Sequence, residues 1–424
     1  MKRLYVGCAA LGVLLVALSM VGWSSLSVRP GLVAASPEPS TSYVGHNDDP
    51  RPLPDFVKKG LDWLARMQFE NGGWGAGAHA RQDVRDPRAV QVDPATTAFA
   101  ATAFLRSGNT LTEGAYRDNV RKAVAYLLDL VEAAPEDGVR ISDATGTQPQ
   151  VKLGEHIDLA MTVQLFTQVL PHTEHDAALR GRVANALETC VTKLTRAQDA
   201  DGSWNSRGGW AGVLQSAMAN SALEMAEVQG VAVDQAVLER SRRYQKDNLD
   251  EASGAVRTES AAGIALYSIA SNQRATSKEA REAEQKIAEG LQAGHLDLAP
   301  ATPLEEAVSE DNLRKLGYDD DDAQRLAEAY RKNKAASRMM QDDDVLSGFG
   351  NNGGEEYLSY MMTSESLAAD NGEEWDAWYQ KMYGRLGKIQ NADGSWSGHH
   401  CITSPVFCTA AVILTMTADR AGRV

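Results

Sequence analysis

The sequence predicts an all-α fold: an α/α toroid (α6/α6 barrel) of six helical hairpins, with an inner ring of helices enclosed by an outer ring. Two observations predict it. A Gln-x5-Trp signature ends three widely separated helical stretches, and charged helical stretches alternate with apolar ones along the chain. The signature residues are Gln68 and Trp74, Gln198 and Trp204, and Gln390 and Trp396.

The N-terminus has the pattern of an export segment. Lys2 and Arg3 precede an uncharged, mostly apolar run, so residues 1–23 are a predicted signal peptide or N-terminal membrane anchor. Residues 24–53 are a Pro/Ser/Asp-rich linker, and residues 54–420 form the predicted toroid. We expect an exported protein of the periplasm or cell envelope. The sequence leaves open whether the segment is cleaved or anchors the chain to the inner membrane through residues 4–23.

Amphipathic helices belong in an outer shell, and helices that are apolar all round belong inside. The predicted outer helices cover residues 55–69, 116–133, 178–198, 234–248, 277–292 and 373–390. The predicted inner helices cover residues 93–107, 156–170, 213–228, 258–271, 357–369 and 404–418.

The spacing of the signatures supports this count of hairpins. The three Gln residues are separated by 130 and 192 residues, which is two and three times a unit of about 64 residues, the size of an α-α hairpin with its loops. One degenerate unit ends at Gly138, where Ala134 and Arg140 replace the Gln and the Trp. Residues 295–350 do not fit a hairpin, and we expect them to be an insertion.

The overall charge excludes one class of partner. The net charge is −15 and the pI is about 5.1, and no Lys/Arg cluster appears beyond the extreme N-terminus. A nucleic-acid partner needs a basic face, so we expect no nucleic acid binding.

The helix-Gln-x-x-x-Gly-x-Trp units resemble those of the prenyltransferase/squalene-cyclase repeat superfamily, whose members are terpenoid cyclases and protein prenyltransferases with an α/α toroid. The resemblance covers residues 54–420. It implies that the three Gln and three Trp side chains are structural and tie each outer helix end to the next inner helix. The stretch 353–365, with Trp375 and the segment His399-His400-Cys401, resembles a bacterial exported subfamily.

The resemblance also raises the question of cyclase chemistry. Class II terpene cyclases protonate their substrate with a D-x-D-D motif, and Asp319-Asp320-Asp321-Asp322 matches those letters. The run lies in the predicted insertion, however, where four adjacent Asp residues are typical of the N-terminus of a surface helix. The aromatic content of 6% is also low for a cavity that stabilises carbocations.

The loops that enter the inner helices gather at one mouth of a toroid, so polar residues at those helix starts are candidates for a binding or acid–base site. The alternative is that they only cap the helices. The candidates are Glu155, His156, Arg207, Trp210, Arg257, Glu259, Glu355, Glu356, His399 and His400.

Three interpretations of the cysteines stay open. Cys8 lies in the export segment and Cys190 in an outer helix, which leaves Cys401 and Cys408 as a candidate disulfide in an oxidising compartment. The alternatives are free thiols, or a zinc site of His399, His400, Cys401 and Cys408, as at the mouth of the protein prenyltransferases. No metal is favoured and no cofactor is predicted, since the spacing of the cysteines is not that of a standard zinc chelate.

Two functions fit these residues. One is a binding or scaffold module of the cell envelope that holds a protein segment or a small apolar or anionic ligand in the mouth of the toroid. The other is a terpenoid-cyclase-like or prenyltransferase-like enzyme that acts on an apolar substrate, which rests on analogy of fold.

Overall fold

The structure is a computed structural model that describes residues 50–299, 302–369 and 372–421. The predicted export segment 1–23 and most of the predicted linker 24–53 lie outside the described residues. Within the described ranges, no helix combines the length and the apolar character needed to cross a bilayer.

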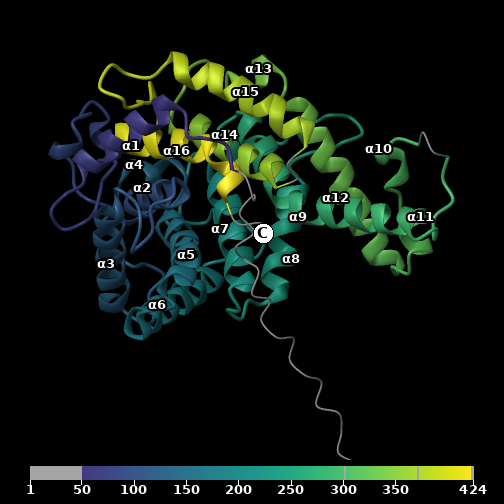
Figure 1. Ribbon diagram of the computed structural model, residues 1–424, viewed down its shortest axis with the longest axis horizontal. Helices are drawn as coiled ribbons and strands as arrows, with labels where there is room; N and C mark the ends of the chain where they lie inside the picture. Colours follow the sequence, from purple (N-terminus) through teal and green to yellow (C-terminus); the bar gives the residue numbers. More distant parts are fainter. Residues whose placement is uncertain (1–49, 300–301, 370–371, 422–424) are drawn as a thin grey trace, which may run out of the picture. The chain divides into compact units, whose positions relative to one another are not determined.

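Six helices form a closed inner ring (Figure 1). Each of them contacts the next, and the last contacts the first, which confirms the predicted α/α toroid. In ring order they are α2 (Pro94–Arg106), α5 (Ile157–Val169), α7 (Gly212–Val228), α9 (Ala265–Gln292), α14 (Gly354–Ala368) and α16 (Pro405–Met416).

The inner helices are sharply defined at their starts and apolar along their length. Asp93 and Ser404 cap α2 and α16 by accepting the backbone N–H groups of Thr96 and Phe407, and a proline follows each cap. Every residue of α16 is buried. A helix without a polar face is stable only when neighbours cover it on all sides, so these helices line the centre.

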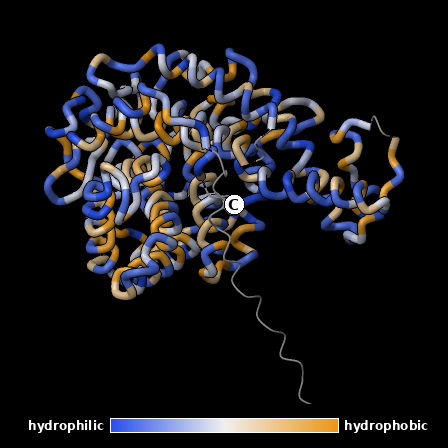
Figure 2. The backbone as a smooth tube through the Cα atoms, viewed as in Figure 1, coloured by the Kyte–Doolittle hydropathy of each residue, from blue (hydrophilic) through white to orange (hydrophobic). Residues whose placement is uncertain are grey.

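The outer helices are amphipathic and cover the inner ring. Figure 2 shows hydrophobic and hydrophilic residues mixed along α3 and α6. The outer helices are α1 (Asp55–Met67), α3 (Arg117–Ala133), α6 (Ala177–Arg196), α8 (Gln235–Lys246), α12 (Asp320–Met339) and α15 (Glu373–Lys388). Short helices complete the described fold: α4 (Gln148–Lys152), α10 (Leu304–Ala307), α11 (Glu310–Lys315) and α13 (Asp343–Leu346).

The prediction that residues 277–292 form the fifth outer helix is wrong. No glycine or proline interrupts the sequence between Ala265 and Glu289, so inner helix α9 continues to Gln292 as one helix. The fifth outer position belongs to α12, which lies within the predicted insertion and packs along α9. A second small core, which includes Ala283, Ile287 and Leu326, holds the far half of α9 against α11 and α12.

The Gln-x5-Trp signature joins each outer helix end to two neighbours. Gln390 Nε2 donates to Gly394 O at 2.8 Å and to Phe56 O in α1 at 2.8 Å, which closes the outer ring between its two ends. Trp396 Nε1 donates to Leu386 O at 2.9 Å in the helix that it follows. The other copies repeat these bonds: Gln68 to Gly72 O and Asn119 O, Gln198 to Gly202 O and Val237 O, Trp74 to Leu64 O, and Trp204 to Leu194 O.

The Gln and Trp side chains were expected to bind the next inner helix, and this expectation is corrected by the structure. Each Gln amide reaches the next outer helix, because a carbonyl of that helix's first turn lies beside it. The bond to the next inner helix comes from the backbone N–H of the Trp, which donates to a hydroxyl there. The acceptors are Thr97 Oγ1 in α2, Ser216 Oγ in α7 and Thr409 Oγ1 in α16.

Lysine replaces the glutamine at the three remaining junctions of the outer ring. Lys193 of α6 donates to Pro135 O and Gly138 O (2.7 Å for the second bond) in the degenerate unit that follows α3. Lys332 of α12 donates to Lys246 O at 2.7 Å at the end of α8. Lys381 of α15 donates to Gln341 O at 2.6 Å just after α12. These bonds independently place α12 in the outer ring.

We predict that Gln390→Ala destabilises the fold by about 1–3 kcal/mol, because two hydrogen bonds that close the ring are lost. Urea unfolding followed by circular dichroism measures the loss. The matched control is Gln292→Ala at the exposed C-terminal end of α9, which should change the free energy of unfolding by less than about 0.5 kcal/mol. Equal effects of the two variants would show that the Gln390 bonds do not hold the ring.

Candidate functional site

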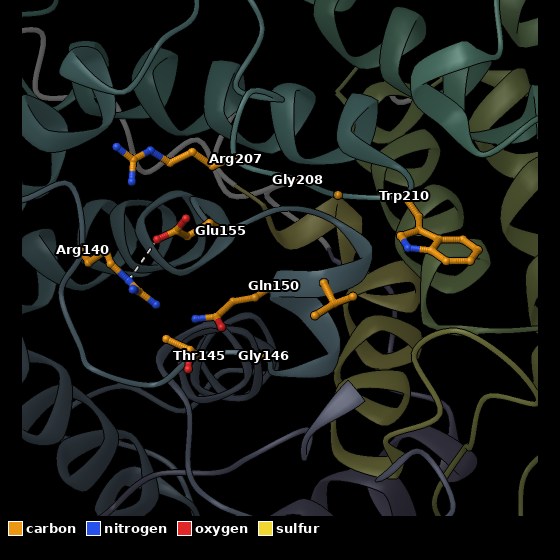
Figure 3. A pocket seen from close by; sticks show the side chains of 10 residues that line it. Arg140, Thr145, Gly146, Gln150, Glu155, Arg207, Gly208 and Trp210 are labelled. Atoms are coloured by element: carbon orange, nitrogen blue, oxygen red, sulfur yellow. Dashed lines mark ion pairs between the residues drawn. The ribbon is translucent and has the colours of Figure 1, made fainter. Parts of the chain in front are cut away.

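Three of the predicted mouth residues, Glu155, Arg207 and Trp210, line one pocket of about 640 Å³ (Figure 3). This volume is in the range of small-molecule sites. The pocket lies between α4, the start of α5 and the loop that enters α7. Its remaining lining residues are Arg140, Thr145, Gly146, Gln150, Val151, Gly208 and Gly209.

The charged groups of this mouth pocket do not balance. Arg140 Nε lies 3.0 Å from Glu155 Oε1 and forms an ion pair with it. Arg207 is exposed, and its guanidinium makes no hydrogen bond or ion pair with any residue that the structure describes. The pocket therefore has one uncompensated positive charge.

Trp210 forms an exposed aromatic surface beside the pocket. The residue is 62% exposed, which is unusual for so large an apolar side chain. Lys152 Nζ lies 3.9 Å from the centroid of the indole and supports one face of the ring by a cation–π contact. The other face remains open to a ligand.

The position of the loop that carries Trp210 depends on a glycine, Gly209. Gly209 has a φ of +113°, and a Cβ at this position would lie 2.4 Å from Leu153 O, so the loop can lie this close to α4 only with glycine here. Ala211 N then donates to Lys152 O at 2.8 Å and fixes the start of α7.

His156, also predicted for the mouth, is not among the residues that line the pocket. It precedes α5 and is 2% exposed, and its Nδ1 has no hydrogen-bond partner in the structure. Burial lowers the pKa of His156, because a charged imidazolium would lose its hydration there. We therefore expect it to stay neutral near pH 7.

A second group of predicted residues forms a buried acidic cluster at the start of α14. Glu356 accepts hydrogen bonds from Tyr267 Oη at 2.5 Å, Gly353 N at 2.7 Å and Phe349 N at 3.1 Å. Glu355 Oε2 accepts the backbone N–H of Ile402 at 3.2 Å. Both carboxylates thus hold the loops at the start of α14, as helix-capping groups do.

Burial raises the pKa of Glu355 to about 8, and the neighbouring charge of Glu356 adds to the shift. Lys152 partly offsets it. His400 Nε2 lies 2.6 Å from Asn351 O and 3.8 Å from Glu356 Oε2, so its ring completes the cluster. Near pH 7 the Glu355 carboxyl is mostly protonated.

Of the three interpretations of the cysteines, the structure has the free thiols at Cys401 and Cys408. Cys408 Sγ is buried in α16 and lies 3.7 Å from Ile402 O. The backbone of Cys401 has a φ of +58°. Burial, together with the nearby carboxyl of Glu355, raises the pKa of its thiol to about 12. The two thiols therefore have separate environments.

The metal alternative concerns His399, His400, Cys401 and Cys408. Among the described residues, no group of three or more His, Cys, Asp or Glu side chains is placed to hold a metal ion. His399 is exposed, and its backbone N–H donates to Asn352 O at 2.8 Å.

Arg257 and Glu259 are exposed and do not belong to the lining of the mouth pocket. They were candidates because they were expected at the start of an inner helix. That helix, α9, begins only at Ala265, because Ala262 and Gly263 both have positive φ.

Sequence reasoning missed the contribution of α4. Gln150 and Lys152 of this short helix face the pocket and Trp210, and Gln148 Oε1 accepts Thr403 N at 2.7 Å at the entry to α16. The signal was present in the sequence. Thr147 and Gln150 form a capping box with Pro149 between them, which marks a helix start.

The described residues of the inner helices α2, α5, α7, α14 and α16 are buried almost throughout. All residues of α14 and α16 are buried, as is α7 from Gly212 to Ala226, although a chamber of substrate size would leave inward-facing side chains accessible to water. Toward the C-terminal ends of α2 and α14, buried Arg106 and Glu365 form an ion pair. Arg274 of α9 approaches the same carboxylate at 3.4 Å.

The four-Asp run has a structural role. Asp319 caps α12 by accepting Asp322 N at 2.8 Å, and Asp320 and Asp322 pair with Arg314 and Arg325. These contacts fit the expected charge cluster at a helix N-terminus.

Comparison with known proteins gives little beyond this geometry. No protein-family model and no curated protein matches the sequence. Among solved structures, the chain is similar to a type II terpene cyclase from Scytonema in complex with its product, merosterolic acid A. That likeness has 12% identity and a TM-score of 0.32, and it covers 86% of this chain and 96% of the cyclase. A TM-score this low supports no inference, and the toroid rests on the helix contacts described above.

We predict that residues 50–424, purified without reductant and unfolded in guanidinium chloride, expose three thiols per chain to Ellman's reagent, one each from Cys190, Cys401 and Cys408. Cys408→Ser should lower the count by one. A single reactive thiol in the wild-type protein would instead demonstrate a bond between Cys401 and Cys408.

We predict that the fold loses stability as the pH rises from about 5 to 8. In this range folded Glu355 keeps a proton that the unfolded chain releases, since its pKa rises from 4.5 to about 8 on folding. Glu355→Gln should flatten this profile and gain a few kcal/mol relative to wild type at pH 8. Urea unfolding at several pH values measures the slope.

A smaller slope should remain in that variant, because burial also raises the pKa of Asp158 to about 7. The control is Glu259→Gln, an exposed carboxyl. Identical pH profiles of the Glu355→Gln and Glu259→Gln variants would contradict the assignment.

Proposed function

We propose that the protein is an exported binding module of the cell envelope that holds its ligand in the mouth pocket lined by Arg140, Glu155, Arg207 and Trp210. The single observation that carries the proposal is the contrast between the mouth and the centre of the ring. The mouth has an open pocket with an unpaired cation and an exposed indole, whereas the inner helices around the centre are buried.

The burial of the inner helices argues against the alternative of an enzyme that encloses an apolar substrate. Such an enzyme needs a dry chamber that buries most of its substrate. Here Arg106, Glu365 and Arg274 place a buried ion-pair network between three inner helices. An apolar chain entering there would break these pairs and leave charges without partners, which is strongly unfavourable.

The mouth pocket, in contrast, needs no rearrangement to admit a ligand. Arg207 and Trp210 already expose their functional groups, so binding would not first break a protein contact of Arg207. The export pattern of Lys2, Arg3 and the apolar run after them supports a place in the cell envelope.

We predict that small ligands selected by their effect on tryptophan fluorescence bind at this pocket. For the anionic ligands among them, Arg207→Ala should weaken the binding affinity at least about tenfold, because a charge-assisted hydrogen bond is lost. Trp210→Ala should weaken them similarly. Isothermal titration calorimetry measures both, and Arg257→Ala, an exposed arginine outside the pocket, is the control.

The enzyme alternative has its own assay. The protein is incubated with squalene or geranylgeranyl diphosphate, and the products are analysed by gas chromatography with mass spectrometry. Turnover of either compound would overturn the proposal, as would ligands whose affinity is unchanged in both pocket variants.

A further inference from the structure

The mouth pocket has two chemically different ends, and this difference indicates what its ligand looks like. Figure 3 shows Arg140, Glu155 and Arg207 at one end and Trp210 at the other, with Gln150 and Thr145 on the side between them. A ligand that uses both ends must therefore be elongated, with a different group at each end.

The charged end suits one carboxylate. Arg140 and Glu155 neutralise each other, so only the charge of Arg207 remains to be met. His156 adds no charge, because burial keeps its imidazole neutral. A guanidinium binds a carboxylate with two parallel hydrogen bonds, whereas a doubly charged group such as a phosphate would leave one negative charge without a partner.

The other end suits the flat C–H face of a sugar ring. Trp210 offers an open indole face, held in place from behind by Lys152 at 3.9 Å. Val151 is the only other large apolar side chain among the lining residues of this pocket. The pocket thus offers a flat apolar surface but no apolar recess of the kind that anchors a peptide side chain.

The middle of the pocket can read hydroxyl groups. Gln150 Nε2 donates both of its hydrogens within the protein, to Ala144 O at 2.9 Å and to Asp158 Oδ2 at 2.8 Å, so only its Oε1, which already accepts Thr147 N at 3.4 Å, could accept a ligand hydroxyl. The Arg140–Glu155 pair presents a donor and an acceptor side by side. The exposed hydroxyl of Thr145 can act as either.

We propose that the mouth pocket binds an acidic oligosaccharide, with a uronic-acid carboxylate on Arg207 and a second sugar ring stacked on Trp210. This inference rests on the proposed function, and it adds the chemical class of the ligand. The elongated pocket requires at least two sugar units, so a single uronic acid should bind much more weakly than an oligomer.

The test compares ligands that differ in one property. Trigalacturonate is titrated into the full chain by isothermal titration calorimetry, beside its methyl ester, which has the same size without the charge. Trimannuronate and a hyaluronan tetrasaccharide extend the series to other linkages. Tri-glutamate, an acidic peptide of equal charge, represents the competing class of ligand.

We expect at least one of the acidic oligosaccharides to bind at least tenfold more tightly than the uncharged ester and than tri-glutamate. Arg207→Gln should lower the affinity of the acid to that of the ester and leave the ester unchanged. Trp210→Ala should weaken both, and Arg257→Gln should weaken neither. Thermal unfolding of each variant verifies that it is folded.

Each contrary result has a defined meaning. Equal binding of acid and ester would overturn the role of the carboxylate, and tighter binding of tri-glutamate would overturn the saccharide class. Absence of binding by all three acidic oligosaccharides would overturn the inference as a whole. In each case the proposed function survives if other ligands depend on Arg207 and Trp210, and fails if none does.

Discussion

The bond between the end of each outer helix and the next outer helix is the constraint on which the rest of the structure depends. Apolar packing favours certain crossing angles between neighbouring helices but fixes their relative register only loosely. A buried or half-buried donor that finds a backbone carbonyl of its neighbour fixes it, because a carbonyl separated from water must be paired. Glutamine makes this bond at three junctions and lysine at three, and Gln390 closes the ring through Phe56.

The glycine of the signature adds a steric constraint at the same junctions. Gly72 and Gly202 have a φ of +91°, and a Cβ at either position would lie 2.3 Å from a carbonyl oxygen of the next outer helix. The loop therefore lies in backbone contact with the next outer helix. The Trp that follows the glycine lies between the outer and inner rings. Once these positions are fixed, the loops that enter the inner helices meet at one mouth, and the pocket there is a consequence of the ring.

The sequence predicted the parts of the fold that depend on local patterns. Caps followed by proline identified Asp93 and Ser404 as helix starts, and both proved correct. The fifth outer helix was misplaced, because a continuous helix without glycine or proline looks the same whether it stays in the ring or extends beyond it. The lysine bonds could not be foreseen, since Lys193 pairs with a loop more than 50 residues away and carries no local signal.

The candidate site was predicted only in part for the same reason. Glu155, Arg207 and Trp210 were found because they stand at or just before helix starts, but whether such a residue caps, packs or faces solvent depends on neighbours far away in the chain. The Glu356 carboxylate accepts hydrogen bonds from the loop before α14, whereas the Arg207 guanidinium makes no bond to the described residues. A polar group with no structural bond to make is free to meet a ligand, and that criterion, rather than position alone, separates the mouth pocket from the acidic cluster beside it.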